Sequence, residues 1–392
     1  MNNNLKILLI GGTGVLSSAV TSEALKSGIH VTMINRGNRA SRIPSGVDLI
    51  KANKNDRSYI EQQLIGKYFD AIIDFLCFTP SELEYSFNLY SQFTNQYLFI
   101  SSCAVYKGSV SSVCDEKSPK IEESWSYSID KYACEQRLIQ LATQKGVNYT
   151  IIRPAITYDD TRLPYGISPR YGYHWTMVAR ILSGKPILTW NNGTNYRNMM
   201  RVEDFAVGVI GLIGNKQAFN DDFNICGDEA PSYQDVLDAI SDYIGISIST
   251  VDIPSEFYAR EIPERAGEML ADRAISVFFS NEKIKHVVPQ FKQKIQLKEG
   301  IRMTLDAYKT RDYQHGIDWK FDGETDRVIE KYVKYERLPN SYNLHFVDYL
   351  NNATRANRKA YLLARYQPRW ISKMLLRLRE QGAIFLHFLQ RL

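Results

Sequence analysis

Residues 127–131 read YSIDK and place a tyrosine and a lysine four positions apart. In a helix, side chains at i and i+4 project from one face, so Tyr127 and Lys131 would be neighbours. A lysine ammonium about 4 Å from a phenolate stabilises it by roughly 4 kcal/mol at an effective dielectric of about 20, which lowers the phenol pKa by up to about three units. Such a tyrosine can act as a general acid–base near neutral pH. The same spacing also suits the polar first turn of an ordinary helix. Whether the pair is catalytic therefore depends on whether the rest of the chain supplies a cofactor site and a hydroxyl partner.

A serine lies where this chemistry needs a hydroxyl partner. The apolar run of residues 97–100 ends in Ser101 and Ser102, and Tyr127 follows Ser102 by 25 residues. In doubly wound sheets, ligands bind beyond the carboxyl ends of the strands. We therefore expect Ser102 to hydrogen-bond the reacting oxygen of a substrate and to hold it near Tyr127.

A dinucleotide site is indicated by the order of elements at the start of the chain. An apolar run at 5–10 leads into the glycine-rich turn GGTGVLS at 11–17, a helix-like stretch at 18–27 and a second apolar run at 29–34. This strand–turn–helix–strand context turns a weak glycine pattern into a specific one.

Each glycine of the turn has a physical role. Gly11 permits the tight turn, and Gly14 lets the backbone approach a pyrophosphate at the helix N-terminus. The third glycine of the pattern is replaced by Ser17, which is small enough for close helix–strand packing. The residues expected to contact the dinucleotide here are Gly11, Gly12, Thr13, Gly14, Val15 and Leu16.

The end of the second strand bears on the choice of cofactor. An acid that binds the adenosine ribose is common there, whereas this chain has Asn35 followed by Arg36, with Arg39 nearby. We expect Asn35 and Arg36 to contact the cofactor. Without a carboxylate to repel it, a 2′-phosphate would be stabilised by the guanidinium groups. We therefore favour NADP slightly over NAD. NAD stays open because Arg36 could serve only to stack on adenine.

Alternation of apolar runs and helical stretches continues beyond this unit. Runs at 69–76 and 96–101 look like buried strands, and 57–64 and 80–93 look like helices. The repeat predicts an α/β fold with a doubly wound, Rossmann-type parallel sheet.

Composition limits the class of protein. The chain has 392 residues, 44% of them hydrophobic and 23% charged, as in an ordinary globular protein of two or three lobes. No apolar run approaches the roughly 18 residues of a membrane span, and five scattered cysteines without a CxxC pattern indicate neither a disulfide framework nor a metal site. We expect a cytoplasmic protein.

The basic residues are concentrated at the C-terminus. Residues 351–392 hold nine Lys or Arg and one acid, Glu380, so the net charge of +5 leaves residues 1–350 mildly acidic. We therefore expect no nucleic acid as a partner of the main body. The apolar stripe near residues 370–378, edged with cations, leaves three alternatives: a helix packed on the enzyme, a helix that docks a partner or a second subunit in a homodimer, and a peripheral helix on an anionic membrane surface.

Four segments together carry a family resemblance. GGTGVLS, ISSCAVY, YSIDK and the strand at 149–154 resemble the extended short-chain dehydrogenase/reductase superfamily in its NAD-dependent epimerase/dehydratase branch, over about residues 5–310. The resemblance implies Ser102, Tyr127 and Lys131 as the catalytic residues. It also implies cofactor contacts by Asn53, at the place of an aspartate that usually binds adenine, and by Phe75. The segment Asn35–Gly37 and the segment 78–80 resemble a divergent, nucleotide-sugar epimerase-like subgroup.

The same resemblance bears on the substrate. Arg197 aligns best with an arginine that holds the substrate pyrophosphate in nucleotide-sugar members, and Arg201 and Arg265 are further phosphate-binding candidates. For the first two arginines, an ion pair with Glu203 or Asp204 is the alternative.

Three parts of the chain are expected. A dinucleotide-binding domain covers 1–157, and 191–230 return to it; a substrate lobe covers 158–190 and 231–310; a helical basic extension covers 320–392. The expected activity is hydride transfer on a sugar, as a nucleotide-sugar 4-epimerase or 4-keto reductase, because Cys103 and Ala104 replace the Asp–Glu pair of dehydratases. The alternative is a non-catalytic or RNA-associated binding protein on the same scaffold.

Overall fold

The computed structural model describes residues 5–107, 113–120, 125–310, 316–339, 342, 344, 348–351 and 353–366. The chain forms two compact units. The first consists of Met1–Asp159, Tyr196–Pro231 and Ser276–Gly300; the second consists of Asp160–Asn195, Ser232–Ile275 and Ile301–Leu392.

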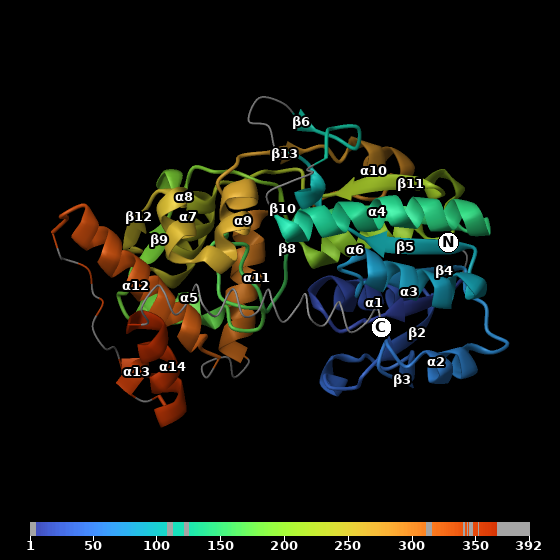
Figure 1. Ribbon diagram of the computed structural model, residues 1–392, viewed down its shortest axis with the longest axis horizontal. Coiled ribbons are helices and arrows are strands. Elements are labelled where there is room, and N and C mark those ends of the chain that lie inside the picture. The colour runs from blue at the N-terminus through green and yellow to red at the C-terminus, as the bar shows by residue number, and fades with distance from the viewer. Residues whose placement is uncertain are drawn as a thin grey trace, which may run out of the picture. The chain divides into compact units, whose positions relative to one another are not determined.

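The first unit is built on a parallel sheet (Figure 1). Within the described residues its seven strands lie in the order β11-β7-β5-β4-β1-β2-β3, and every neighbouring pair is parallel. The strands are β1 (Lys6–Ile10), β2 (His30–Asn35), β3 (Val47–Lys51), β4 (Ala71–Asp74), β5 (Gln96–Ile100), β7 (Asn148–Pro154) and β11 (Asp221–Ile225). The order reverses between β1 and β4, where doubly wound sheets bind their ligands. The predicted Rossmann-type fold class is confirmed.

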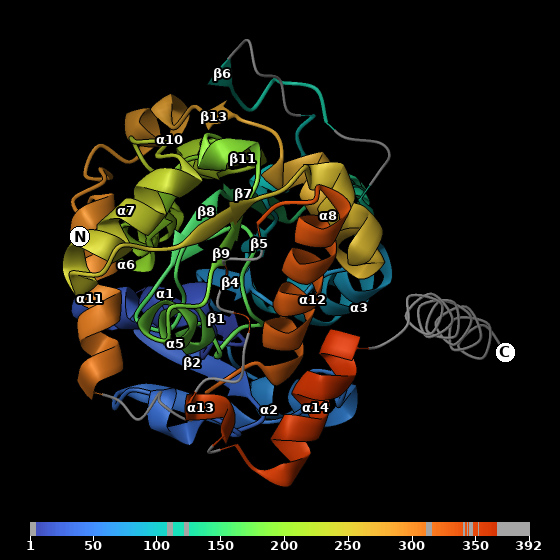
Figure 2. The same ribbon diagram turned by 90° about the vertical axis from the view of Figure 1, so that its left-hand side faces the viewer.

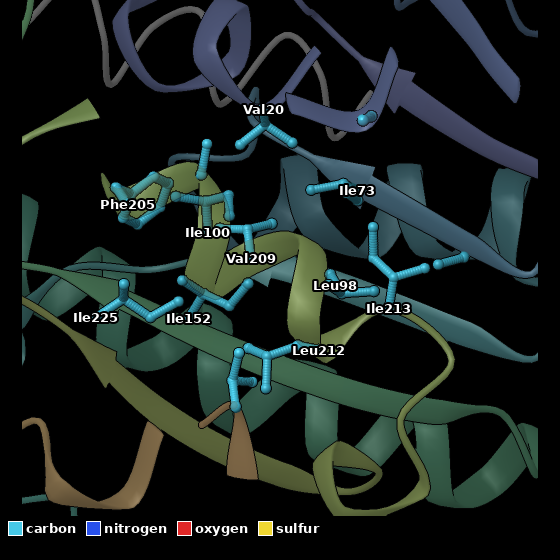
Figure 3. Close-up of a cluster of buried hydrophobic side chains, with 14 of the residues drawn as sticks. Val20, Ile73, Leu98, Ile100, Ile152, Phe205, Val209, Leu212, Ile213 and Ile225 are labelled. Atoms are coloured by element: carbon cyan, nitrogen blue, oxygen red, sulfur yellow. The ribbon is translucent and has the colours of Figure 1, made fainter. Parts of the chain in front are cut away.

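Helices cover both faces of this sheet, which explains its continuous apolar strands. In β1, Ile7 and Leu9 join one buried cluster, and Leu8 and Ile10 join the other. Successive side chains of a strand point to opposite faces, so a strand covered on both sides must be apolar throughout. Figure 3 shows the first cluster, in which Phe205 and Val209 pack against Ile152. That side is covered by α1 (Val15–Lys26) and α6 (Val202–Leu212), and the other by α2 (Arg57–Leu64), α3 (Pro80–Tyr90) and α4 (Ser126–Lys145).

The edge strand β3 has no counterpart in the sequence-based expectation. Within Val47–Lys51 only Ile50 is buried, and Leu49 is 41% exposed. An edge strand with one covered position shows no apolar run, so hydrophobic patterning does not reveal it.

Residues 276–300 belong to the first unit, although the expected substrate lobe extended from 231 to 310. Ile284, Val288 and Phe291 pack into the same core as Phe205, which ties this segment to the sheet. The short elements of the first unit are β6 (Val113–Cys114), β8 (Ile156–Tyr158), β10 (Met199–Arg201), β13 (Phe278–Phe279) and α10 (Glu282–Val287).

The second unit is mainly helical. Its two short strands pair in parallel. Its elements are α5 (Trp175–Leu182), β9 (Ile187–Thr189), α7 (Tyr233–Ile244), β12 (Thr250–Asp252), α8 (Ser255–Glu261), α9 (Ala266–Glu268), α12 (Trp319–Tyr335), α13 (Asp348–Asn351) and α14 (Arg355–Tyr366), and α11 (Leu297–Thr310) contributes its residues from 301 onward.

The C-terminal helices are part of the second unit rather than a separate extension. α12 and α14 lie side by side (Figure 2), and the Tyr361 hydroxyl donates to Asp326 at 2.6 Å. Asp326 and Asp322 of α12 form ion pairs with Arg180 and Lys185. No helix in the described part of the chain is long and apolar enough to cross a membrane. The apolar, cation-edged stripe predicted near residues 370–378 lies outside the described residues.

Candidate functional site

The glycine-rich turn between β1 and α1 has the geometry of a phosphate cradle. Gly11 and Gly12 have φ values of +116° and +97°, which other residues rarely adopt. A Cβ on Gly12 would overlap the Met33 side chain, so a larger residue here would force that side chain to move. Gly14 is the N-cap of α1, whose first turn carries no acid. The free N–H groups and the dipole of this helix N-terminus therefore suit a pyrophosphate.

Two polar side chains hold this turn in place. Asn35 Nδ2 donates to Gly11 O and to Thr13 Oγ1, both at 3.0 Å, while its Oδ1 accepts from Gly37 N at 2.8 Å. Ser17 is buried, and its Oγ accepts from Gly14 N at 2.8 Å. The serine that replaces the third glycine thus caps the helix. Asn35 braces the turn, a role that the sequence interpretation missed because only the strand register brings residue 35 beside Gly11.

The other expected cofactor residues follow β2, β3 and β4 or begin α1. Arg36 is exposed just beyond β2, and Arg39 Nη1 donates to Thr13 O at 3.4 Å. Asn53 is exposed, and its Oδ1 accepts from Asn55 N at 3.1 Å. Phe75 is half-buried, with its Cβ 3.6 Å from the position that a Cβ on Gly11 would take. Val15 and Leu16 form the first turn of α1.

The catalytic candidates lie at the carboxyl ends of β4 and β5. Tyr127 and Lys131 are in the first turns of α4, where the i, i+4 spacing puts them on one face. Lys131 is 3% exposed, and its ammonium donates to Cys77 O at 2.6 Å and to Ile100 O at 2.8 Å. Ser102 follows β5, and its Oγ accepts from Ala104 N at 3.1 Å. The structure thus ties the lysine to the ends of both central strands.

Tyr127 is half-buried, and its ring centroid lies 5.0 Å from that of Trp125. The charge of the neighbouring lysine is set by opposing influences. Burial lowers the pKa of Lys131, whereas the Cys134 and Cys77 thiols and the Asp74 carboxylate raise it. A buried cation beside these groups is suited to stabilise a phenolate on the same helix face.

A buried ion pair behind the site fixes α4 to the sheet. Arg153 of β7 forms a bidentate pair with Glu135 of α4, at 2.8 and 2.7 Å, and both side chains are 2–3% exposed. Ser101 Oγ donates to Glu135 Oε1 at 2.5 Å. Sequence reasoning missed this network, although an arginine inside an apolar strand and an acid four residues after Lys131 were available as signals.

Of the three arginines expected to bind substrate, Arg197 and Arg201 are buried and Arg265 is half-buried. Arg201 is fully buried and forms a bidentate pair with Glu203, at 2.9 and 2.6 Å, which is the ion-pair alternative that the sequence left open. Arg197 is 5% exposed, with its guanidinium carbon 5.7 Å from the Phe279 ring centroid. Arg265, in the second unit, donates to Ser168 O at 2.8 Å. Their roles toward a substrate stay predictions.

One known family matches the part of the chain that holds most of these residues. Residues 7–226 match the NAD dependent epimerase/dehydratase family. This range includes the glycine turn, Ser102, Tyr127, Lys131, Arg197 and Arg201. The chain belongs to this family. The predicted resemblance to the extended short-chain dehydrogenase/reductases is thereby confirmed, and the protein is an enzyme of that type in an NAD-dependent family.

Two curated relatives show how far the sequence similarity extends. The chain is 25% identical to the chloroplast stem-loop binding protein of 41 kDa b from Arabidopsis thaliana, over 85% of each chain. It is 19% identical to 2′-dehydrokanamycin reductase from Streptomyces kanamyceticus, over 69% of this chain and 75% of the reductase.

Two solved structures share the fold. The UDP-glucuronic acid 4-epimerase from Bacillus cereus, in complex with NAD, has a TM-score of 0.62 at 18% identity. The UDP-glucose 4-epimerase from Thermotoga maritima, with UDP-glucose, has a TM-score of 0.63 at 17% identity. Each covers 78% of this chain and 99% of its own.

Proposed function

We propose that this family member transfers hydride to and from a carbon of a nucleotide sugar, as a 4-epimerase or a 4-keto reductase. The observation that carries the proposal is the buried Lys131, held by the carbonyls that follow β4 and β5, one helical turn from Tyr127 and next to the strand end that carries Ser102. The bound nicotinamide would supply hydride acceptance and donation. The side chains of the chain would handle the proton and the reacting oxygen.

Each side chain has a defined task in this scheme. The Tyr127 phenolate takes the proton from the sugar hydroxyl when the carbon is oxidised, and the phenol returns it when the ketone is reduced. The Lys131 ammonium favours the phenolate near neutral pH. Ser102 Oγ would donate a hydrogen bond to the reacting oxygen. Cys103 and Ala104 have no carboxylates, so water elimination lacks an acid–base pair at this strand end.

The surroundings of the turn favour NADP over NAD as the preferred form of the cofactor. The Asn35 side chain forms hydrogen bonds with Gly11 O and Gly37 N. The segment after β2 has no carboxylate that would repel a 2′-phosphate. Arg36 and Arg39 supply positive charge at the same place. Guanidinium groups bind phosphate oxygens in pairs, which supports this preference.

The substrate class rests on related enzymes and on the three arginines. The Bacillus cereus and Thermotoga maritima enzymes act on UDP-sugars, and Arg197, Arg201 and Arg265 are candidates for the pyrophosphate of such a substrate. The test is to incubate the purified enzyme with UDP-, dTDP-, GDP- and CDP-sugars and either NAD(H) or NADP(H). We expect conversion at C4 of at least one sugar, measured by chromatography. If no sugar reacts with any cofactor, the proposal fails.

Binding of structured RNA is a second candidate function, because the Arabidopsis relative that matches over 85% of the chain is a stem-loop binding protein. The acidic balance of residues 1–350 opposes it. Filter binding to an RNA stem-loop between 50 and 200 mM salt separates the two functions. RNA affinity that falls steeply with salt would report several phosphate contacts and support this candidate.

A further inference from the structure

The turn of residues 75–78, directly after β4, touches both parts of the candidate site. Its Cys77 carbonyl accepts the 2.6 Å hydrogen bond from Lys131 Nζ. On the cofactor side, Leu76 Cγ lies 3.5 Å from the position that a Cβ on Gly11 would occupy. Any shift of this turn would therefore move a hydrogen-bond acceptor of the lysine and a wall of the glycine turn together.

Three charged side chains hold the backbone of this turn, and we call Asp74, Lys54 and Glu82 the turn clamp. Asp74 Oδ1 accepts from Leu76 N at 2.7 Å, and Lys54 Nζ donates to Leu76 O at 2.9 Å. Glu82 Oε2 accepts from Phe78 N at 2.9 Å. Lys54 and Glu82 also form an ion pair at 2.7 Å, so the clamp joins β4, α3 and the segment after β3.

Asp74 is the buried member of the clamp. It is 1% exposed, and its Oδ2 accepts hydrogen bonds from Cys77 Sγ at 3.1 Å, from Tyr97 OH at 2.8 Å and from Ser86 Oγ. Burial raises the pKa of Cys77 and Tyr97, and the Asp74 charge raises both further, so both groups keep the protons that they donate. A carboxylate that accepts this many hydrogen bonds is held in one orientation.

We propose that the turn clamp is a positioning device for Lys131: it fixes the Cys77 carbonyl so that the lysine ammonium is held beside Tyr127. The inference rests on the proposed function for the role of Tyr127, and it assigns Asp74, Lys54 and Glu82 as positioning residues. None of the three was expected from the sequence, because they come from separate elements and converge on one four-residue turn.

Removing a clamp carboxylate would change the pKa of the Tyr127 phenol in two opposite ways. Burial lowers the pKa of Lys131, and the carboxylates of Asp74 and Glu82 act against that lowering. Loss of a carboxylate makes the site more positive, and this electrostatic effect alone lowers the pKa of the Tyr127 phenol. Loss of positioning moves the ammonium away, or releases its proton, and raises the phenol pKa. The sign of the change therefore identifies which effect dominates.

The experiment is an ultraviolet titration of phenol ionisation at about 295 nm in the full-length protein, with the Tyr127→Phe difference isolating this phenol. The variants are Glu82→Ala and Asp74→Asn, and Glu82→Gln is the conservative variant that keeps an acceptor for Phe78 N. Glu84→Ala is the matched control, because Glu84 on the same helix pairs with Arg137 at 2.7 Å and, among the described residues, forms no hydrogen bond or ion pair with the turn. NADH affinity, measured by fluorescence, is the second readout.

We expect Glu82→Ala and Asp74→Asn to raise the phenol pKa by about one unit and to weaken NADH binding at least about threefold. Glu82→Gln should recover most of both effects, and Glu84→Ala should change neither. A lowered or unchanged phenol pKa in Glu82→Ala would overturn the proposal. Should Asp74→Asn not fold, Glu82→Ala decides alone, since the side chain of Glu82 is 36% exposed.

Neither readout requires a substrate, so this inference and the proposed function can fail separately. A raised phenol pKa in a protein that converts no sugar would support the clamp and refute the proposed activity. If the enzyme converts a sugar but the clamp variants leave the phenol pKa unchanged, the proposed activity is supported and the clamp is refuted.

Discussion

The four buried charges that attach α12 to the rest of the second unit allow a quantitative test. Lys185 Nζ lies 2.6 Å from Asp326 Oδ2, and Arg180 Nη1 lies 2.8 Å from Asp326 Oδ1. All of these side chains are 0–1% exposed. The Asp326→Asn substitution keeps the volume and leaves Arg180 and Lys185 sharing the single carboxylate of Asp322. An uncompensated buried charge of this kind costs roughly 3–5 kcal/mol.

This cost predicts a large change in thermal stability. For a unit of about 150–250 residues, 1 kcal/mol shifts Tm by about 2–4 °C, so Asp326→Asn should lower Tm by roughly 6–20 °C. Adding Lys185→Met restores charge balance, and the double variant should recover more than about 2 kcal/mol of the loss. The surface pair of Arg57 with Glu61 is the control: Glu61→Gln should stay within about 0.5 kcal/mol.

Calorimetry of the full-length protein measures these changes, and its pH dependence adds a second check. Burial alone would raise the pKa of Asp326, but Arg180 and Lys185 outweigh it and hold the pKa below the ordinary value. A depressed carboxyl pKa contributes stability that is present above about pH 4 and is lost as the pH falls through the folded pKa. The difference in stability between wild type and Asp326→Asn should therefore become smaller at acid pH. The reasoning would be refuted if Asp326→Asn lost no more stability than Glu61→Gln. It would also be refuted if the double variant with Lys185→Met were as unstable as Asp326→Asn alone.

Three further predictions concern individual side chains. Tyr127→Phe should abolish turnover and leave cofactor affinity nearly unchanged, because the phenol acts in proton transfer; wild-type kcat would exclude the catalytic assignment. Arg36→Asp should shift preference from NADP toward NAD through repulsion of the 2′-phosphate, and an unchanged ratio of the two Kd values would show that Arg36 does not contact that phosphate. Burial, with Arg162 and Arg265 nearby, lowers the pKa of His174 to about 3, so its NMR signals should not titrate between pH 5 and 8. Because the unfolded imidazole binds a proton below about pH 6.5, the contribution of His174 to stability should fall as the pH drops from there toward 3, and His174→Phe should reduce that acid sensitivity.

The sequence by itself determined the fold class and the site motifs of the first unit. The strand at 5–10, the turn at 11–14 and the helix after it follow from local rules: apolar runs, glycine conformations and helix termini. The boundaries of α2 (Arg57–Leu64) were also predicted to the residue. These features depend on neighbours in the chain, which a sequence displays directly.

Only the tertiary structure decided which distant side chains meet. Asn35 braces the glycine turn because β2 lies beside β1. Lys54, Asp74 and Glu82 converge because the segment after β3, the end of β4 and the first turn of α3 meet around residues 75–78. The four buried charges around Asp326 likewise join α12 to residues more than 130 positions earlier. Hydrophobic patterning assigns charged residues to the surface, so it cannot foresee a buried charge whose partner is brought to it by the fold.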